Sequence, residues 1–225
     1  MHRFNVKNFQ TIIFDCDGVI LNSNKIKTEA FFEVTKSYGL NNAERLKEYH
    51  ILNGGISREE KFKHFFNVIL KKKPKNSEMK KLLNDFSSEV CHQLLNCEIN
   101  NDLEKFKEFT PNAKWLVISG GNQDELRKVF LKRKISFLFD GGIFGSPENK
   151  DQLIKNQILK KNITGNSVYI GDSLYDQKVS NMNNLFFIFL SKWTEVKDWQ
   201  KQIQISENSF SDLSELMIHN SSVND

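Results

Sequence analysis

The chain has 225 residues, 39% hydrophobic and 27% charged, and its 32 basic and 28 acidic side chains give a net charge of +4. This composition is typical of a soluble globular protein with room for one core domain and a sizeable insertion, or for two small domains. No apolar stretch approaches the ~20 residues that a membrane span needs, so we expect no membrane partner. The one dense basic cluster, "KKKPK" at residues 71–75, is interpreted as a solvated helix end rather than a nucleic-acid patch.

Cysteine and histidine usage narrows the chemistry. The three cysteines form no C-x-x-C pair, which argues against a disulfide framework, and the five histidines show no zinc spacing. Any bound metal is therefore expected to be a hard cation held by oxygen. The N-terminal segment "MHRFNVKNF" has no apolar signal region, which predicts a cytoplasmic location.

The first predicted element is a short strand at residues 11–14, "TIIF", which runs directly into Asp15 and Asp17. A strand that is apolar throughout is typical of a parallel sheet covered on both faces. A lone aspartate after such a strand is commonly a helix cap or a turn former. Two carboxylates one residue apart indicate something more than a turn.

Residues 22–103 contain no convincing strand and are predicted to form an all-helical insertion. In the segment 57–72, one face of a helix carries apolar residues at Phe62, Phe65, Phe66, Ile69 and Leu70. Ser57 and Glu60 match a capping box at the start of this helix. The segment 77–95 repeats the same periodicity.

Beyond the insertion, apolar runs alternate with helical patterns. Strands are predicted at residues 115–119, 137–145, 167–171 and 185–190. Helices are predicted at residues 122–134, 150–162 and 173–182. Strand followed by helix, repeated, predicts a doubly wound α/β fold with a parallel, Rossmann-like sheet. We therefore expect a core made of residues 1–21 and 104–225, with residues 22–103 inserted into it as a separate domain.

Polar side chains follow three of the predicted strands. Asp15 and Asp17 follow the first, and Ser119 and Asp172 stand at the ends of two others. Ligands of open α/β sheets bind outside the carboxyl ends of the strands, so these four residues are expected in one crevice. Three carboxylates would repel one another there unless some are protonated or a cation is present. Mg²⁺ suits such a site, because it prefers carboxylate oxygens and shares phosphate oxygens of the substrate.

Four short motifs occupy these positions. They are "FDCDGVILNS" at residues 14–23, "VISGG" at 117–121, Lys150 in "GSPENKDQ", and "GDSLYD" at 171–176. In this order they resemble the four motifs of the haloacid dehalogenase-like (HAD) hydrolase superfamily, and they cover the whole core. The insertion after the first motif resembles the helical cap of the subgroup that contains phosphoglycolate phosphatase and β-phosphoglucomutase.

The resemblance implies a role for each acidic motif residue. Asp15 would attack phosphorus and become an aspartyl-phosphate, and Asp17 would act first as general acid and then as general base. The metal site would consist of the carboxylates of Asp15 and Asp172 and the backbone carbonyl of Asp17. Asp176 would hold a metal-bound water or Lys150 from outside the metal's own ligands.

The same resemblance implies a phosphate-binding group. Ser119 and Lys150 would bind the equatorial phosphoryl oxygens, over which the charge of the transition state is spread. The backbone amide after Ser119 would add a donor, and Gly120 with Gly121 would permit close approach of the backbone.

Two residues of the insertion are predicted to contact the substrate. The segment "GGISREEKF" at 54–62 resembles part of the β-phosphoglucomutase-like cap, in which Arg58 would reach the phosphate or hydroxyls of the substrate. The alternative is that Arg58 is an exposed first-turn residue beside an acidic neighbour. Lys27 lies ten residues after Asp17, where the mutase group has a catalytic histidine. This difference, and Asn22 in place of an acidic residue, argue against mutase chemistry.

The expected function is a Mg²⁺-dependent phosphatase that hydrolyses a small phosphomonoester, such as a sugar phosphate or similar metabolite, through an aspartyl-phosphate. The alternatives are a β-phosphoglucomutase-type sugar phosphomutase, a haloacid dehalogenase, which needs no Mg²⁺, and a phospho-accepting receiver-like regulatory module, which has no helical insertion of this size. The expected partner is a small phosphorylated metabolite, with no nucleic acid and no membrane, and the protein is expected to be a monomer or a dimer.

Overall fold

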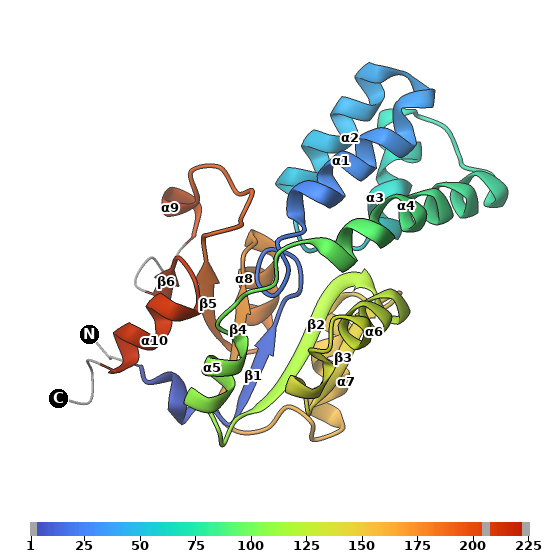
Figure 1. Cartoon of the computed structure of the whole chain (residues 1–225). Helices are drawn as coiled ribbons and strands as arrows, with labels where there is room; N and C mark the ends of the chain where they lie inside the picture. Colours follow the sequence, from blue (N-terminus) through green and yellow to red (C-terminus); the bar gives the residue numbers. More distant parts are fainter. Residues whose placement is uncertain (1–3, 204–207, 222–225) are drawn as a thin grey trace.

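A parallel β-sheet with helices on both faces forms one part of the molecule, and a group of helices stands at the carboxyl edge of that sheet (Figure 1). The structure, a computed structural model, describes residues 4–203 and 208–221. The strands in these residues are β1 Thr11–Phe14, β2 Lys114–Asn122, β3 Gly142–Ser146, β4 Ser167–Gly171, β5 Phe186–Leu190 and β6 Ser209–Phe210.

The sheet has the strand order β3-β2-β1-β4-β5-β6, and every neighbouring pair is parallel. Phe14, the last residue of β1, is paired with Val117 on one side and Ile170 on the other. The chain extends the sheet from β1 first toward β3 and then toward β6. The carboxyl end of β1 is therefore the point where the strand order reverses, at which such sheets bind ligands.

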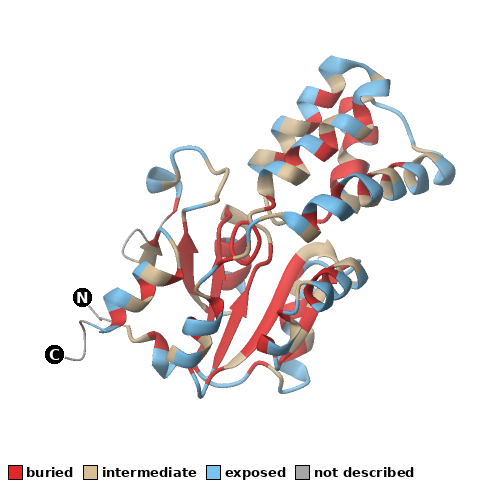
Figure 2. Ribbon diagram, viewed as in Figure 1, coloured by how far each residue is buried: buried red, intermediate tan, exposed pale blue. Residues whose placement is uncertain are grey.

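Helices pack on the two faces of the sheet because successive side chains of each strand point to opposite sides. Phe14 and Trp115 are buried on one face, and Ile13 and Leu116 are buried on the other. The strands of the sheet are buried along most of their length (Figure 2). The first face is covered by α5 Leu103–Phe109, α6 Gln123–Lys132 and α10 Leu213–Ser221. The second is covered by α7 Lys150–Leu159 and α8 Leu174–Met182.

The helical insertion has a small aromatic core of its own. Its elements are α1 Asn24–Thr35, η2 Lys36–Tyr38, α2 Leu40–Leu52, α3 Arg58–His64, the π-helix η3 Phe65–Ile69 and α4 Asn76–Asn96. The Phe31 ring centroid lies 4.4 Å from that of Phe86 and 5.3 Å from that of Phe62. Ser57 caps α3 as predicted, because its side chain accepts a hydrogen bond of 3.3 Å from the Glu60 amide. These contacts hold three helices together around one cluster of rings.

The predicted fold class, a doubly wound parallel sheet with an inserted all-helical unit, is confirmed. The strand predicted at residues 137–145 is wrong in its first half, since η4 Ser136–Leu138 precedes β3. β2 runs to Asn122, beyond the predicted end, with a shift in its pairing to β3 between Ile118 and Asn122. The prediction missed β6, which is only two residues long. The predicted domain boundaries stay a prediction.

The remaining short elements are η1 Val6–Asn8 and α9 Trp199–Gln202. Near the ends of the described chain, the Val6 amide donates a hydrogen bond of 2.7 Å to the Asn220 side chain, which ties the first turn to α10. None of the helices in residues 4–203 and 208–221 is long and apolar enough to cross a bilayer.

Candidate active site

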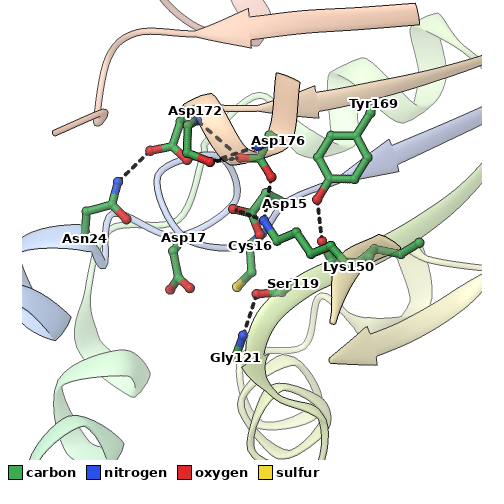
Figure 3. A network of polar contacts seen from close by, with 12 residues as sticks. Asp15, Cys16, Asp17, Asn24, Ser119, Gly121, Lys150, Tyr169, Asp172 and Asp176 are labelled. Atoms are coloured by element: carbon green, nitrogen blue, oxygen red, sulfur yellow. Dashed lines mark hydrogen bonds and ion pairs between the residues drawn. The ribbon is translucent and has the colours of Figure 1, made fainter. Parts of the chain in front are cut away.

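A buried lysine lies between two aspartates at the carboxyl end of β1 (Figure 3). The Lys150 ammonium nitrogen lies 2.9 Å from Asp15 Oδ2 and 2.5 Å from Asp176 Oδ1. All three side chains are 4% exposed or less. The structure thus places Lys150 beside the strand-end Asp15 and in contact with Asp176, and the predicted roles of these residues stay predictions.

Local helix-capping signals place these side chains. Asn149 and Gln152 form a capping box that starts α7, so that Lys150 is its first residue and points back to the strand ends. Ser173 and Asp176 form a second capping box at the start of α8, in which Ser173 Oγ lies 2.7 Å from Asp176 Oδ2. Both oxygens of Asp176 thus have partners before any ligand binds.

Asp172 follows β4 and completes a cluster of three carboxylates. Oxygen atoms of Asp15, Asp172 and Asp176 lie within 4.8 Å of one another. The single ammonium of Lys150 does not balance three ionised carboxylates, so the cluster as a whole would carry an excess of negative charge. Burial, and then the carboxylates of Asp15 and Asp176, raise the pKa of Asp172 well above its usual range. Burial also raises the pKa of Asp15, to about 7, although Lys150 opposes the shift.

The backbone leaves room for Asp172 beside the first motif because residue 18 is glycine. Gly18 has a φ of +76°, and a Cβ there would lie 2.0 Å from Asp172 Oδ2. That oxygen accepts a hydrogen bond of 2.6 Å from the Asn24 amide at the start of α1. The insertion therefore reaches into the carboxylate cluster from its first helical residue.

Asp17 points away from the cluster and has separate partners. Ser23 Oγ donates a hydrogen bond of 2.5 Å to Asp17 Oδ1, and the Lys27 ammonium lies 2.5 Å from Asp17 Oδ2. Burial would raise the pKa of the Asp17 carboxyl, but Lys27 and the two hydrogen bonds outweigh it, so that the pKa is lowered. The Asp17 carboxylate thus lies outside the cluster of three carboxylates, and the predicted binding of a metal by its backbone carbonyl stays a prediction.

Ser119 comes from β2, the neighbour of β1 (Figure 3). It is fully buried, and its Oγ accepts a hydrogen bond of 3.1 Å from the amide of Gly121. It lies inside β2 rather than after it, because the strand continues to Asn122, whose side chain caps α6. The prediction that Ser119 belongs to the strand-end crevice is compatible with this placement.

A pocket between the core and the insertion opens onto these residues. Asp15, Asp17 and Asp172 line it from the core, and Lys27 and Arg58 line it from the insertion. Carboxylates and basic side chains that lie far apart in the sequence therefore share one cavity. The two predicted insertion residues both reach it.

Arg58 is held by the core in this conformation. Its two terminal nitrogens lie 2.9 and 3.0 Å from the oxygens of Glu125 on α6, and Nη1 also donates to Ser87 at 2.9 Å. The side chain is only 10% exposed, so the alternative of an exposed first-turn residue is wrong. Contact of Arg58 with a substrate stays a prediction.

The insertion rests directly on the predicted phosphate-binding turn. A Cβ on Gly120 would lie 2.3 Å from the Gly55 carbonyl oxygen in the loop before α3. Only a residue without a side chain permits this approach of two backbones. The insertion therefore packs directly against the core at the lining of the pocket.

The pocket residues that sequence reasoning missed include His50, Lys61 and Glu195. Lys61 Nζ lies 2.6 Å from His50 Nδ1, and the Thr28 hydroxyl donates a hydrogen bond of 2.6 Å to Glu195. A signal for Lys61 was present, because it lies four residues before Phe65 and so at the edge of the apolar stripe. The chain contains many lysines, and the sequence alone did not distinguish Lys61 from the exposed ones.

Comparison with known proteins decides the family. A family model described as "Haloacid dehalogenase-like hydrolase" matches residues 12–190, which include Asp15, Ser119, Lys150 and Asp172. The chain belongs to this family of hydrolases. Among curated proteins the comparison finds no match.

Solved structures of HAD-like proteins have the same fold. A candidate haloacid dehalogenase-like hydrolase of Bacteroides fragilis is 18% identical with a TM-score of 0.71, over 93% of this chain and 100% of that one. A predicted phosphoglycolate phosphatase of Haemophilus somnus is 16% identical with a TM-score of 0.69, over 96% and 98%. A candidate β-phosphoglucomutase of Bacteroides vulgatus is 12% identical with a TM-score of 0.75, over 96% and 89%. At these identities the likeness concerns the fold.

Proposed function

We propose that this HAD-like hydrolase is a Mg²⁺-dependent phosphatase that hydrolyses a small phosphomonoester through an aspartyl-phosphate on Asp15. One observation carries the proposal. Asp15 is buried at the reversal point of the sheet, with one oxygen bound to Lys150 and with Asp172 beside it. A carboxylate held in this way is positioned as a nucleophile next to groups that suit a phosphoryl dianion.

In the first half of the reaction, an Asp15 oxygen attacks phosphorus and the bond from phosphorus to the leaving oxygen breaks. Asp17 gives its proton to that oxygen, which leaves as an alcohol. The ion pair with Lys27 favours the ionised form of Asp17 in the structure. A phosphoryl dianion arriving next to Asp17 would favour the protonated form by repulsion between like charges.

In the second half, Asp17 takes a proton from a water molecule, and the resulting hydroxide attacks phosphorus. The bond from phosphorus to Asp15 breaks, inorganic phosphate is released and the Asp15 carboxylate is restored. Lys27 and Ser23 hold the ionised carboxylate of Asp17 in place for this step. General acid–base catalysis of this kind contributes ~10²–10⁴-fold to a rate.

The residues present fit a magnesium ion. Three buried carboxylates face one ammonium, and Asp172 has only the Asn24 amide as a side-chain partner among the described residues. Asp15 and Asp172 would hold the ion together with the backbone carbonyl of Asp17. A bound Mg²⁺ supplies positive charge that neutralises phosphoryl oxygens. Oxygen ligands without histidine or cysteine favour this metal over zinc.

The family assignment weighs on the alternatives. The match to a hydrolase family over residues 12–190 argues against a receiver-like regulatory module. A sugar phosphomutase is disfavoured by Lys27, which forms an ion pair with Asp17 where the mutase group has a catalytic histidine. A small phosphorylated metabolite in a cytoplasmic setting remains the proposed context.

The test is a phosphate-release screen over sugar phosphates, nucleotides and small acid phosphates, each with Mg²⁺ and with EDTA. We expect release from at least one phosphomonoester, abolished by EDTA and restored by added Mg²⁺. Glucose 1-phosphate is followed separately for conversion to the 6-phosphate, which would indicate a mutase instead. Absence of release from every phosphomonoester would contradict the proposal.

A further inference from the structure

Three basic side chains of the insertion line the pocket, and two of them are neutralised. Lys27 forms an ion pair with Asp17, and Arg58 forms a two-pronged ion pair with Glu125. The third is Lys61, on α3. Among the described residues, no carboxylate forms an ion pair with Lys61, which distinguishes it from the other two.

Lys61 is nevertheless almost fully removed from water. It is 2% exposed, its Nζ lies 5.5 Å from the centre of the Phe31 ring, and its hydrogen-bond partner is His50 Nδ1 at 2.6 Å. A lysine that only supports a helix normally extends its ammonium to solvent. Lys61 instead directs its ammonium to the pocket lining, where an ammonium without a counter-charge is costly.

The charges that surround Lys61 do not remove this cost. Burial, together with the nearby charges of Lys27 and Lys150, lowers the pKa of Lys61 to about 7, while Asp17 and Glu195 only partly oppose this shift. An ammonium has three donors and no acceptor, so a neutral His50 accepts one hydrogen bond from it. Two N–H groups remain without a partner among the described residues. The Lys61 ammonium can therefore donate further hydrogen bonds to a ligand in the pocket.

Lys61 lies in the same pocket as Asp15, the proposed nucleophile. Asp15 and Lys61 both line that pocket, so one ligand can reach both. We propose that Lys61, supported by His50, binds a second anionic group, a carboxylate or a phosphate, on the organic part of the substrate. This inference rests on the proposed phosphatase function and narrows its substrate class to phosphomonoesters with a charged leaving group.

Matched substrate pairs test the inference on the unaltered protein with Mg²⁺. The first pair is 3-phosphoglycerate and glycerol 3-phosphate, which differ only by a carboxylate in place of a hydroxymethyl group. The second is fructose 1,6-bisphosphate and either fructose monophosphate, which differ by one phosphate. We expect kcat/KM to be about 10-fold or more higher for the charged member of at least one pair, as one charge-assisted hydrogen bond would give. The pair that shows the preference identifies the anion as carboxylate or phosphate.

Substitution of Lys61 assigns the preference to this residue. In Lys61→Met the ratio of kcat/KM within the preferred pair should fall about 10-fold toward unity. Lys63→Met, on the exposed side of the same helix, is the matched control and should keep the ratio. Equal or better turnover of the uncharged members by the unaltered protein, or an unchanged ratio in Lys61→Met, would overturn the inference while the phosphatase function stands. No release from any phosphomonoester would overturn both.

Discussion

The two walls of the pocket carry unbalanced charges of opposite sign. On the core side, Lys150 pairs with Asp15 and Asp176, and Asp172 lies beside them without an ammonium partner among the described residues. On the insertion side, Lys61 has no carboxylate partner in the described part of the chain. A metal ion and a substrate with a second negative group would balance both. In the proposed function, the core would carry out the reaction and the insertion would select the substrate.

The largest expected effect concerns the core wall. Asp15→Asn keeps the size of the side chain but removes the nucleophile, so phosphate release should fall by ~10³-fold or more while the protein stays folded. Asp124→Asn, in the exposed first turn of α6, is the matched control and should keep full activity. Thermal unfolding of both variants checks the fold. Activity of Asp15→Asn within tenfold of the unaltered protein would reject the mechanism.

The next effect is on stability. Lys150→Met leaves Asp15 and Asp176 facing each other without the ammonium between them, so the free energy of unfolding should fall by about 3–5 kcal/mol. Lys155→Met is the control, because Lys155 lies on the same helix, is 56% exposed and pairs with Asp151 on the surface. Urea unfolding measures both. Equal losses of unfolding free energy in the two variants would show that the buried ion pairs of Lys150 do not stabilise the protein more than the surface pair of Lys155.

Substitution of Lys61 in the insertion should raise the free energy of unfolding, in contrast to Lys150→Met, and the size of this effect should depend on pH. Folding lowers the pKa of Lys61 from 10.5 to about 7, so between these values the unfolded chain binds more protons and stability rises with pH. Lys61→Met should therefore exceed the unaltered protein in unfolding free energy at pH 6 by on the order of 5 kcal/mol. That gap should narrow toward pH 9. Urea unfolding at both pH values tests this, and a gap independent of pH would contradict it.

The backbone contact between the insertion and the core can be disturbed without changing any charge in the pocket. Gly120→Ala places a Cβ against the Gly55 carbonyl, so the insertion must shift, at a cost of about 1–3 kcal/mol. Lys132→Ala, at the exposed end of α6 and away from the pocket, is the control. KM should rise about 10-fold in the first variant only. Small-angle scattering should show a more extended molecule, and an unchanged profile would show that the insertion does not rest on residue 120.

The smallest expected effect is on the ion pair that joins the walls. Glu125 is 31% exposed, so Glu125→Gln should weaken the hold on Arg58 by roughly 0.5–1 kcal/mol, which corresponds to about a 2–5-fold rise in KM. Asp85→Asn breaks the exposed pair with Lys81 on α4 and should leave KM unchanged. Similar KM values for the two variants would mean that the Arg58–Glu125 pair does not keep the pocket closed.

The core of the site was predictable because strand ends of a parallel sheet meet at one edge. Asp15 and Asp172 follow the neighbouring strands β1 and β4, and Lys150 begins the helix after β3. Their convergence follows from topology, which short apolar runs and capping signals reveal. The partners of Lys27 and Arg58 were not predictable, because their positions depend on how a helix packs against another part of the chain.

Local sequence patterns were sufficient to predict the parallel sheet, the helical insertion and the acidic residues at the strand ends. These patterns are apolar runs, 3.6-residue periodicity and helix caps. Each involves only a few neighbouring residues, so it can be recognised from the sequence alone. Only the tertiary structure decided which charges are balanced. Lys61 and Lys63 are the same residue type two positions apart, yet one is buried against His50 and the other is exposed. Burial and pairing come from elements distant in sequence, and these determine the electrostatic cost of each charge.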